Sequence, residues 1–187
     1  MLEKFSVAIS KRLCSNLNIA DEQYEACCYG CETLLHTLLS TLGLIIIGLC
    51  AHMVMETLII IAIFYTNQTF GGGFHATSHV KCFLTMVLFL TLGLFFCSLP
   101  LNLSIDISLL IPAIVILFLN PLVLHENKKY LATRTAFFIK RSLILNSFWV
   151  ITVVLCIVMQ TFLIRPIAVG LTLSAVSRLA ARWKTTQ

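Results

Sequence analysis

Long apolar stretches alternate with short polar segments along most of this chain. Each stretch is close to the length that an α-helix needs to cross about 30 Å of hydrocarbon, at a rise of about 1.5 Å per residue. The stretches lie at residues 33–51, 54–70, 82–99, 105–124, 143–164 and 166–180. The pattern therefore predicts an all-α, polytopic membrane protein with about six membrane-embedded helices.

Two of these stretches are weaker candidates for complete crossings. Residues 54–70 contain Glu56 and are short, so a re-entrant segment is the alternative to a span. Residues 166–180 are less apolar because they contain Ser174, Ser177 and Arg178. Prolines are expected to mark helix ends or kinks. They occur at Pro100, Pro112, Pro121 and Pro166.

The first 31 residues have a different pattern. Basic residues come first and acidic residues follow, which is typical of amphipathic helices that lie at a membrane surface. No short apolar region followed by a cleavage site indicates a removable signal peptide. Because no long polar linker divides the remainder, we predict one integral membrane domain over residues 1–187, with an interfacial region at 1–31 and a transmembrane bundle at 33–180.

Composition supports the membrane interpretation. Hydrophobic residues make up 59% and charged residues 11% of the chain, and the mean hydropathy is +0.97. A soluble domain carries about 25% charged residues, so the composition argues against a soluble fold. The net charge of +5 does not indicate nucleic-acid binding, because the basic residues lie between apolar stretches.

The basic residues also predict the orientation of the helices. They are grouped at residues 4–12, 81, 128–141 and 178–184, which are alternate boundaries of the apolar stretches. Since basic residues favour the cytoplasmic side, we expect both termini and the segment before the third span to lie there.

The eight cysteines do not form a clear disulfide framework. Cys50, Cys97 and Cys156 lie inside apolar stretches, where a thiol acts as a small hydrophobic side chain. A CCxxC cluster ends at Cys31, but no second pair completes a metal-ligand set. We expect reduced thiols on the cytoplasmic side.

Candidate chemistry is concentrated between the second and third predicted spans, in the sequence TNQTFGGGFHATSHVKCF. Three glycines at residues 71–73 permit positive φ angles and close backbone approach, which suits a loop that receives an extended peptide. A plain hinge between two spans is the alternative. The segment then contains His75, His79 and Cys82.

Cys82 is the candidate nucleophile. It lies at the start of the third span, where the unpaired N–H groups, the helix dipole and the adjacent Lys81 favour a thiolate. A histidine within hydrogen-bond reach would act as its base. His75 and Cys82 would lie about 10 Å apart along one continuous helix, so His75 requires the segment to bend back, whereas His79 is three residues away and reaches Cys82 on a regular helix.

A zinc site, as in a zinc-dependent membrane hydrolase, is a second interpretation of the same residues. His75, His79 and Cys82 give the spacing H-x3-H-x2-C, which places two imidazoles on one helical face beside a soft ligand. The segment lacks the glutamate base of the HExxH motif, so we expect no metal or other cofactor. A third interpretation is that both histidines face lipid headgroups.

The string GGGFHATSHVKC resembles the signature of the AgrB family (accessory gene regulator protein B), and the chain length and the hydropathy pattern are also similar. The resemblance implies a membrane cysteine endopeptidase of bacterial quorum sensing, in the plasma membrane. Cys82 would cleave the C-terminal tail from an AgrD-like propeptide through a thioester, with His75 as base. An internal cysteine or serine would then close a thiolactone or lactone ring.

Other residues receive supporting roles. The candidate auxiliaries of the site are His79, Gly72, Gly73 and Ser78. The residues that would attract the acidic tail of the propeptide, rather than only set topology, are Lys128, Lys129 and Arg134. The resemblance implies a short propeptide and membrane lipid as partners and leaves a homodimer open. A non-enzymatic transporter or assembly protein, in which Glu56 lines a polar path, is the alternative class.

Overall fold

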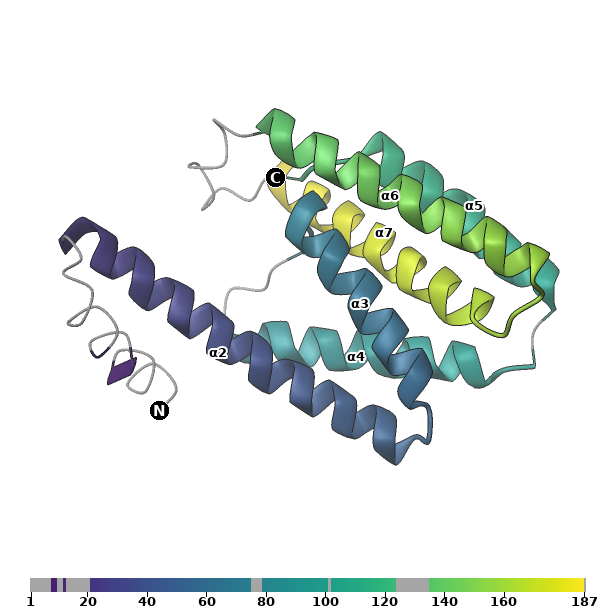
Figure 1. Cartoon of the computed structure of the whole chain (residues 1–187), viewed down its shortest axis with the longest axis horizontal. Helices are drawn as coiled ribbons and strands as arrows, with labels where there is room; N and C mark the ends of the chain where they lie inside the picture. The colour runs from purple at the N-terminus through teal and green to yellow at the C-terminus, as the bar shows by residue number, and fades with distance from the viewer. Residues whose placement is uncertain are drawn as a thin grey trace. The chain divides into compact units, whose positions relative to one another are not determined.

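The computed structural model describes residues 8–9, 12, 21–74, 79–100, 102–123 and 135–186, without the side chains of 21–29, 32, 79 and 184–186. The elements with described bounds are all α-helices (Figure 1). They are α2 (Asp21–Cys50), α3 (Val54–Gly71), α4 (His79–Ser98), α5 (Leu103–Leu119), α6 (Thr135–Val158) and α7 (Ile164–Thr186). The predicted all-α class is confirmed within these residues.

Within the described part of the chain, four helices are long and apolar enough to cross a membrane, judged by length and composition. The crossing segments are Thr33–Cys50, Val80–Ser98, Thr135–Val158 and Ile164–Trp183, and α5 is a shorter apolar helix. The polytopic membrane class is therefore confirmed. Residues 54–70 form helix α3, which is not among the four, so a total of six crossings stays a prediction.

The structure corrects the bounds of the fifth predicted span, which corresponds to helix α6. The sequence predicts a span at 143–164, but α6 begins at Thr135 and ends at Val158. Lys140 and Arg141 resemble loop residues in a hydropathy pattern, yet both lie in the helix. The guanidinium of Arg141 lies over the ring of Phe137, 4.5 Å from its centroid, which accommodates the charge on the helix surface.

The chain divides into two compact units, residues 1–46 and residues 47–187. The first contains most of α2, which begins at Asp21, so residues 21–31 continue into the same helix as the first predicted span. The second contains helices α3 to α7 and both candidate sites described below. The prediction of one domain stays a prediction.

Helix α7 is the centre of the second unit. It contacts α3, α4, α5 and α6, and Figure 1 shows it between them. Within its crossing segment, 67% of the residues are buried, compared with 17% for α4 and 22% for α6. The hydrophobic core includes Ile63 of α3, Leu117 of α5 and Leu171 of α7. Residues 166–180, a weaker candidate span by hydropathy, thus form the helix that the other helices surround.

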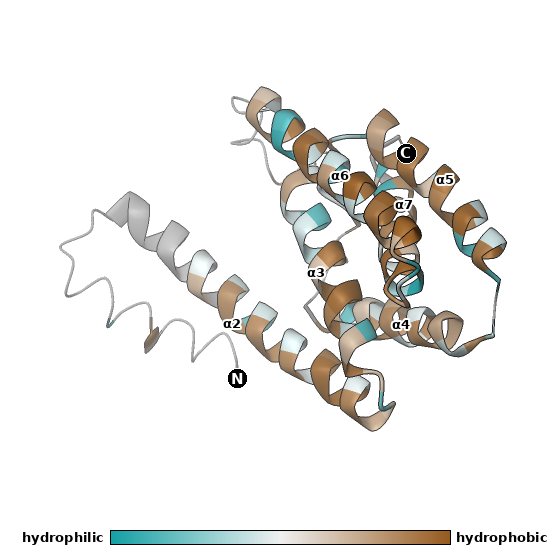
Figure 2. Cartoon of the chain, turned by 45° about the vertical axis from the view of Figure 1, so that its right-hand side comes forward, coloured by the Kyte–Doolittle hydropathy of each residue, from teal (hydrophilic) through white to brown (hydrophobic). Residues whose placement is uncertain are grey.

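Small residues allow this central position. A Cβ atom at Gly170 would lie 3.1 Å from Cβ of Ile63, and one at Gly93 of α4 would lie 3.0 Å from Cγ1 of Val169. Close approach of helix backbones at small residues is a common packing mode in membranes, where burial from water supplies no driving force. Long apolar side chains instead face outward along the other helices, where Figure 2 shows hydrophobic residues on α5 and α6.

Candidate functional site

Cys82 lies in the first turn of α4, at the start of the crossing segment, as expected from the hydropathy pattern. The residue is half-buried. It lines a small cavity of about 10 Å³. The other lining residues include Gln68 of α3, Ser177 of α7, and Phe74 in the segment that follows α3. This space holds about one water molecule, so an extended peptide requires the surrounding side chains to move.

The glycine-rich segment is held against α7 by hydrogen bonds. The backbone N–H of Phe74 donates to the carbonyl oxygen of Ser177 (3.1 Å) and to its Oγ (3.0 Å). Nε2 of Gln68 donates to the same Oγ at 3.0 Å. The N–H of Val123 donates to the carbonyl oxygen of Gly71 at 2.9 Å. The path of the chain is therefore fixed up to the residue that precedes His75.

The described chain on either side of His75 shows where the two helices stop. Helix α3 ends at Gly71, residues 72–74 are not helical, and the described part of α4 begins at His79. Phe74 and Cys82 line the same cavity although eight positions separate them. The chain at Phe74, the last described residue before His75, therefore lies close to Cys82.

The three glycines are packed against other parts of the chain. Gly72 has φ 72° and ψ −179°, a conformation in which residues with a Cβ atom are strained. A Cβ atom at Gly72 would overlap the carbonyl oxygen of Val123, and one at Gly71 would overlap the guanidinium of Arg178. At Gly73 a Cβ atom would lie 2.8 Å from Oγ of Ser177. Their small size serves internal close packing in the described structure.

We expect Gly72→Ala to lower the free energy of unfolding by about 1–3 kcal/mol, because the substitution imposes backbone strain and an overlap with Val123. Unfolding of the detergent-solubilised protein, followed by circular dichroism, measures this change. Gly30→Ala on α2 is the matched control, since no described atom lies within 4 Å of the added Cβ, and it should gain about 0.5–1 kcal/mol. Equal stabilities of the two variants would contradict the packing role of Gly72.

Arg178 of α7 is fully buried, with 0% of its surface exposed. Its Nη1 donates to the carbonyl oxygens of Leu117 (3.2 Å) and Asn120 (2.9 Å), at the end of α5 where carbonyl groups lack helical partners. Its Nη2 donates to Oδ1 of Asn67 (2.9 Å) and Oγ of Ser142 (3.2 Å). One guanidinium thus joins α3, α5 and α6 to α7.

The sequence groups Arg178 with the basic residues of a cytoplasmic boundary, and the structure corrects this for its side chain. The residue lies inside the protein because neutral acceptors on three helices surround it, and the absent side chain of Gly71 leaves room for its guanidinium. The sequence feature that could have indicated a buried Arg178 was a set of polar residues within or at the ends of the apolar stretches. Polar residues inside membrane helices generally face the bundle interior.

The remaining predicted site residues are not placed by the structure. His75, Ser78, Lys128, Lys129 and Arg134 lie outside the described residues. His79 is the first residue of α4, but its side chain is outside the described part. The described residues contain no group of three side chains suited to a metal ion. The choice of base, the zinc alternative and the tail contacts therefore stay predictions.

The fold and the site define a polytopic helical membrane protein with a cysteine at the start of a crossing helix, beside a glycine-rich segment whose Phe74 lies close to it. Comparison with known families identifies it further. The family model described as Accessory gene regulator B matches residues 6–178. The chain belongs to this family, AgrB, which functions in accessory gene regulator quorum sensing.

Two relatives from Clostridium perfringens match parts of the chain. "Putative AgrB-like protein" of strain SM101 / Type A is 34% identical over 82 residues, which is 44% of this chain and 38% of the relative. "Putative AgrB-like protein 2" of strain 13 / Type A is 29% identical over 117 residues, which is 59% of this chain and 55% of the relative. The matches thus span about half of these relatives or less. No solved structure matches the chain.

Proposed function

We propose that this protein is a membrane cysteine endopeptidase that removes the C-terminal tail of an AgrD-like propeptide and supports cyclisation of the remainder. The observation that carries the proposal is the cavity shared by Cys82 and Phe74. It brings the residue adjacent to His75 beside a cysteine in the first turn of α4. Membership of the AgrB family is consistent with a processing peptidase.

The proposed reaction has two acyl transfers. His75 takes the proton of the Cys82 thiol, and the sulfur attacks the carbonyl carbon of the residue before the tail. As the C–N bond breaks, His75 delivers that proton to the leaving nitrogen, so the tail departs with a free amine and a thioester remains. An internal thiol or hydroxyl of the bound peptide then attacks the thioester, its proton returns to the Cys82 sulfur, and a ring closes.

The apolar surroundings of Cys82 support cyclisation over hydrolysis. Phe64, Phe74 and Phe89 line the cavity beside Cys82, and apolar side chains packed around a bound peptide limit the access of water to a thioester. A tethered nucleophile in the bound peptide has a high effective concentration, which favours ring closure further. We place the reaction at the cytoplasmic face of a bacterial plasma membrane, where the basic residues Lys128, Lys129 and Arg134 would attract an acidic tail.

A trapped intermediate tests the proposal. A propeptide whose internal nucleophile is replaced by alanine cannot close the ring, so we expect the protein to accumulate a thioester with the peptide body. Intact mass spectrometry should show a mass increase equal to that of the peptide without its tail, and hydroxylamine should remove it. Cys82→Ala should acquire no adduct. Tail release by the wild-type protein without any adduct on Cys82, even at short times and low temperature, would overturn the covalent mechanism.

A further inference from the structure

A second, larger cavity of about 630 Å³ lies at the end of the helix bundle opposite Cys82. It is lined by residues from the start of α3, α5 and α7 and from the end of α4, including Glu56, Cys97, Asp106 and Arg165. Cys97 follows Cys82 by 15 positions on α4, which corresponds to about 22 Å along the helix axis. The cavity is therefore separate from the proposed catalytic site.

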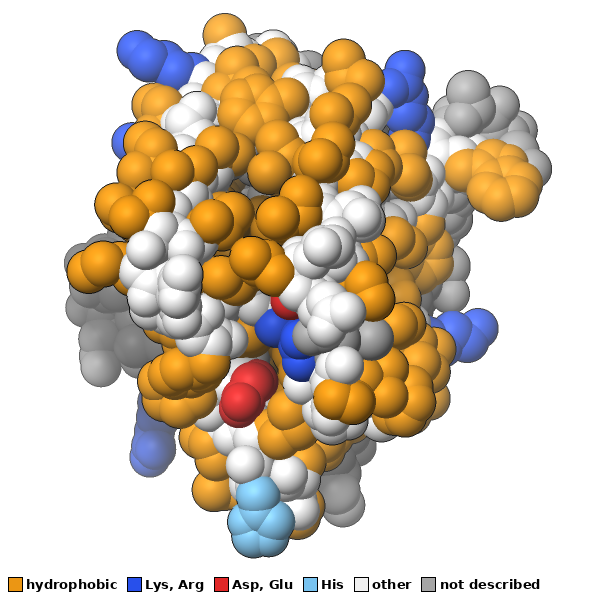
Figure 3. Space-filling model, turned by 90° about the vertical axis from the view of Figure 1, so that its right-hand side faces the viewer, with side chains coloured by type: hydrophobic (Ala, Val, Ile, Leu, Met, Phe, Trp, Pro, Cys, Tyr) orange, Lys and Arg blue, Asp and Glu red, His pale blue; other side chains and the backbone are white. Residues whose placement is uncertain are grey.

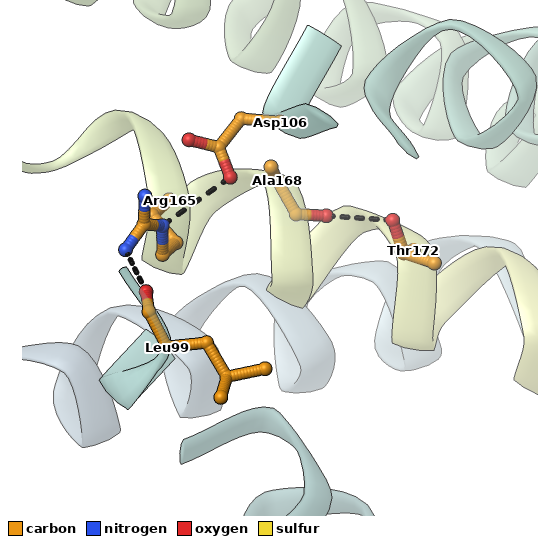
Figure 4. Close-up of polar contacts among 5 residues, drawn as sticks. All are labelled: Leu99, Asp106, Arg165, Ala168 and Thr172. Atoms are coloured by element: carbon orange, nitrogen blue, oxygen red, sulfur yellow. Dashed lines mark hydrogen bonds and ion pairs between the residues drawn. The ribbon is translucent and has the colours of Figure 1, made fainter. Parts of the chain in front are cut away.

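Charged groups of both signs face this cavity. Nε of Arg165 lies 3.3 Å from Oδ1 of Asp106 in an ion pair, and its Nη1 donates to the carbonyl oxygen of Leu99 at 2.5 Å (Figure 4). The Asp106 side chain is 7% exposed and that of Arg165 is 23% exposed. Figure 3 shows acidic and basic side chains in a hollow on this face, with hydrophobic side chains around them.

Glu56 gives the cavity an excess of negative charge. Its residue is half-buried in the first turn of α3, and the described residues offer its carboxylate no hydrogen bond or ion pair. The other carboxylate, Asp106, already accepts from Arg165. Two carboxylates thus face one guanidinium. Because an uncompensated carboxylate that is partly removed from water is costly, the cavity favours a ligand with a positive group.

The position of the cavity indicates an amphiphilic ligand. The crossing segments of α4 and α6 end at Ser98 and Val158, and that of α7 begins at Ile164, so the cavity lies at the depth of lipid headgroups. Two apolar residues of its rim, Phe162 and Leu103, are 72% and 46% exposed. A ligand with a charged head and an apolar body therefore matches both the interior and the rim.

We propose that this cavity binds the zwitterionic headgroup of an ammonium phospholipid such as phosphatidylethanolamine. The ammonium donates to the Glu56 carboxylate, the phosphate lies toward the Arg165 guanidinium, and the acyl chains follow the apolar rim at Phe162 and Leu103. The Arg165–Asp106 pair forms the polar wall that keeps the two charged groups of the lipid apart. This site is independent of the peptidase proposal.

Native mass spectrometry of the full chain tests the site. The protein is extracted from nanodiscs that contain equal amounts of phosphatidylethanolamine and phosphatidylglycerol with identical acyl chains. We expect the wild-type protein to retain phosphatidylethanolamine at least about tenfold over phosphatidylglycerol, because only the ammonium forms a hydrogen-bonded ion pair with the Glu56 carboxylate. Glu56→Gln should lose this preference, and Glu56→Asp should keep part of it.

Thermal unfolding provides a second measurement that does not depend on retention. Phosphatidylethanolamine should raise the melting temperature of the wild-type protein more than phosphatidylglycerol does, and Glu56→Gln should lose only that difference. Equal retention of the two lipids by the wild-type protein, or an unchanged preference in Glu56→Gln, would overturn the proposal. Displacement of the lipid by millimolar ethanolamine alone would also overturn it, since the site would then recognise a soluble amine.

Discussion

Cys82→Ala should lower the rate of propeptide tail release by at least about 10³-fold, because the thioester cannot form without the thiol. The rate is measured with purified protein in lipid vesicles and a synthetic propeptide, with the released tail quantified by chromatography. Cys50→Ala is the matched control. Cys50 is exposed at the end of α2 and makes no disulfide, so its substitution should leave the rate unchanged. A Cys82→Ala variant that releases the tail at the wild-type rate would refute the peptidase assignment.

Two histidine variants identify the base in the same assay. His75→Ala should reduce tail release by about 10²–10⁴-fold if His75 takes the thiol proton, while His79→Ala should have a small effect. The reverse result would assign the base to His79, which belongs to the same helix as Cys82. We expect His75 to be the base because Phe74, the residue before it, lines the same cavity as Cys82.

Arg178→Met should destabilise the protein by about 2–4 kcal/mol, because removal of the guanidinium leaves acceptors of Leu117, Asn120 and Asn67 buried without donors. The substitution also removes the free-energy cost of burying a charge, which offsets part of the destabilisation. The free energy of unfolding is measured by titration with a denaturing detergent. Arg178→Lys should also destabilise the protein, since one ammonium cannot reach acceptors on three helices.

Arg141→Met is the control for the loss of an arginine from a crossing helix. Arg141 is exposed and lies over the ring of Phe137, so its substitution should change stability by no more than about 1 kcal/mol. If Arg178→Met were as stable as Arg141→Met, the conclusion that the Arg178 guanidinium joins α3, α5 and α6 to α7 would be wrong.

Arg178→Met should also reduce the rate of tail release. Arg178 is adjacent to Ser177, whose Oγ accepts a hydrogen bond from the backbone N–H of Phe74 beside the proposed catalytic site.

Several features of the site were accessible from the sequence. The start of a crossing helix at Cys82 follows from the polar-to-apolar change at residues 79–82, and the break between α3 and α4 follows from three adjacent glycines. The residues that contact these glycines could not be predicted from the sequence. Gly71 accommodates Arg178 and Gly72 lies against Val123, contacts between residues more than 50 positions apart that no local pattern encodes.

The sequence by itself determined the class of this protein, because apolar stretches of membrane-crossing length and a scarcity of charge leave few alternatives to a helical bundle in lipid. Only the tertiary structure decided which helix lies at the centre. Hydropathy ranks residues 166–180 as a weak span, yet α7 is the most buried of the four crossing segments. The physical reason is that hydropathy measures affinity for lipid, whereas a helix enclosed by protein satisfies its polar side chains with neighbouring helices.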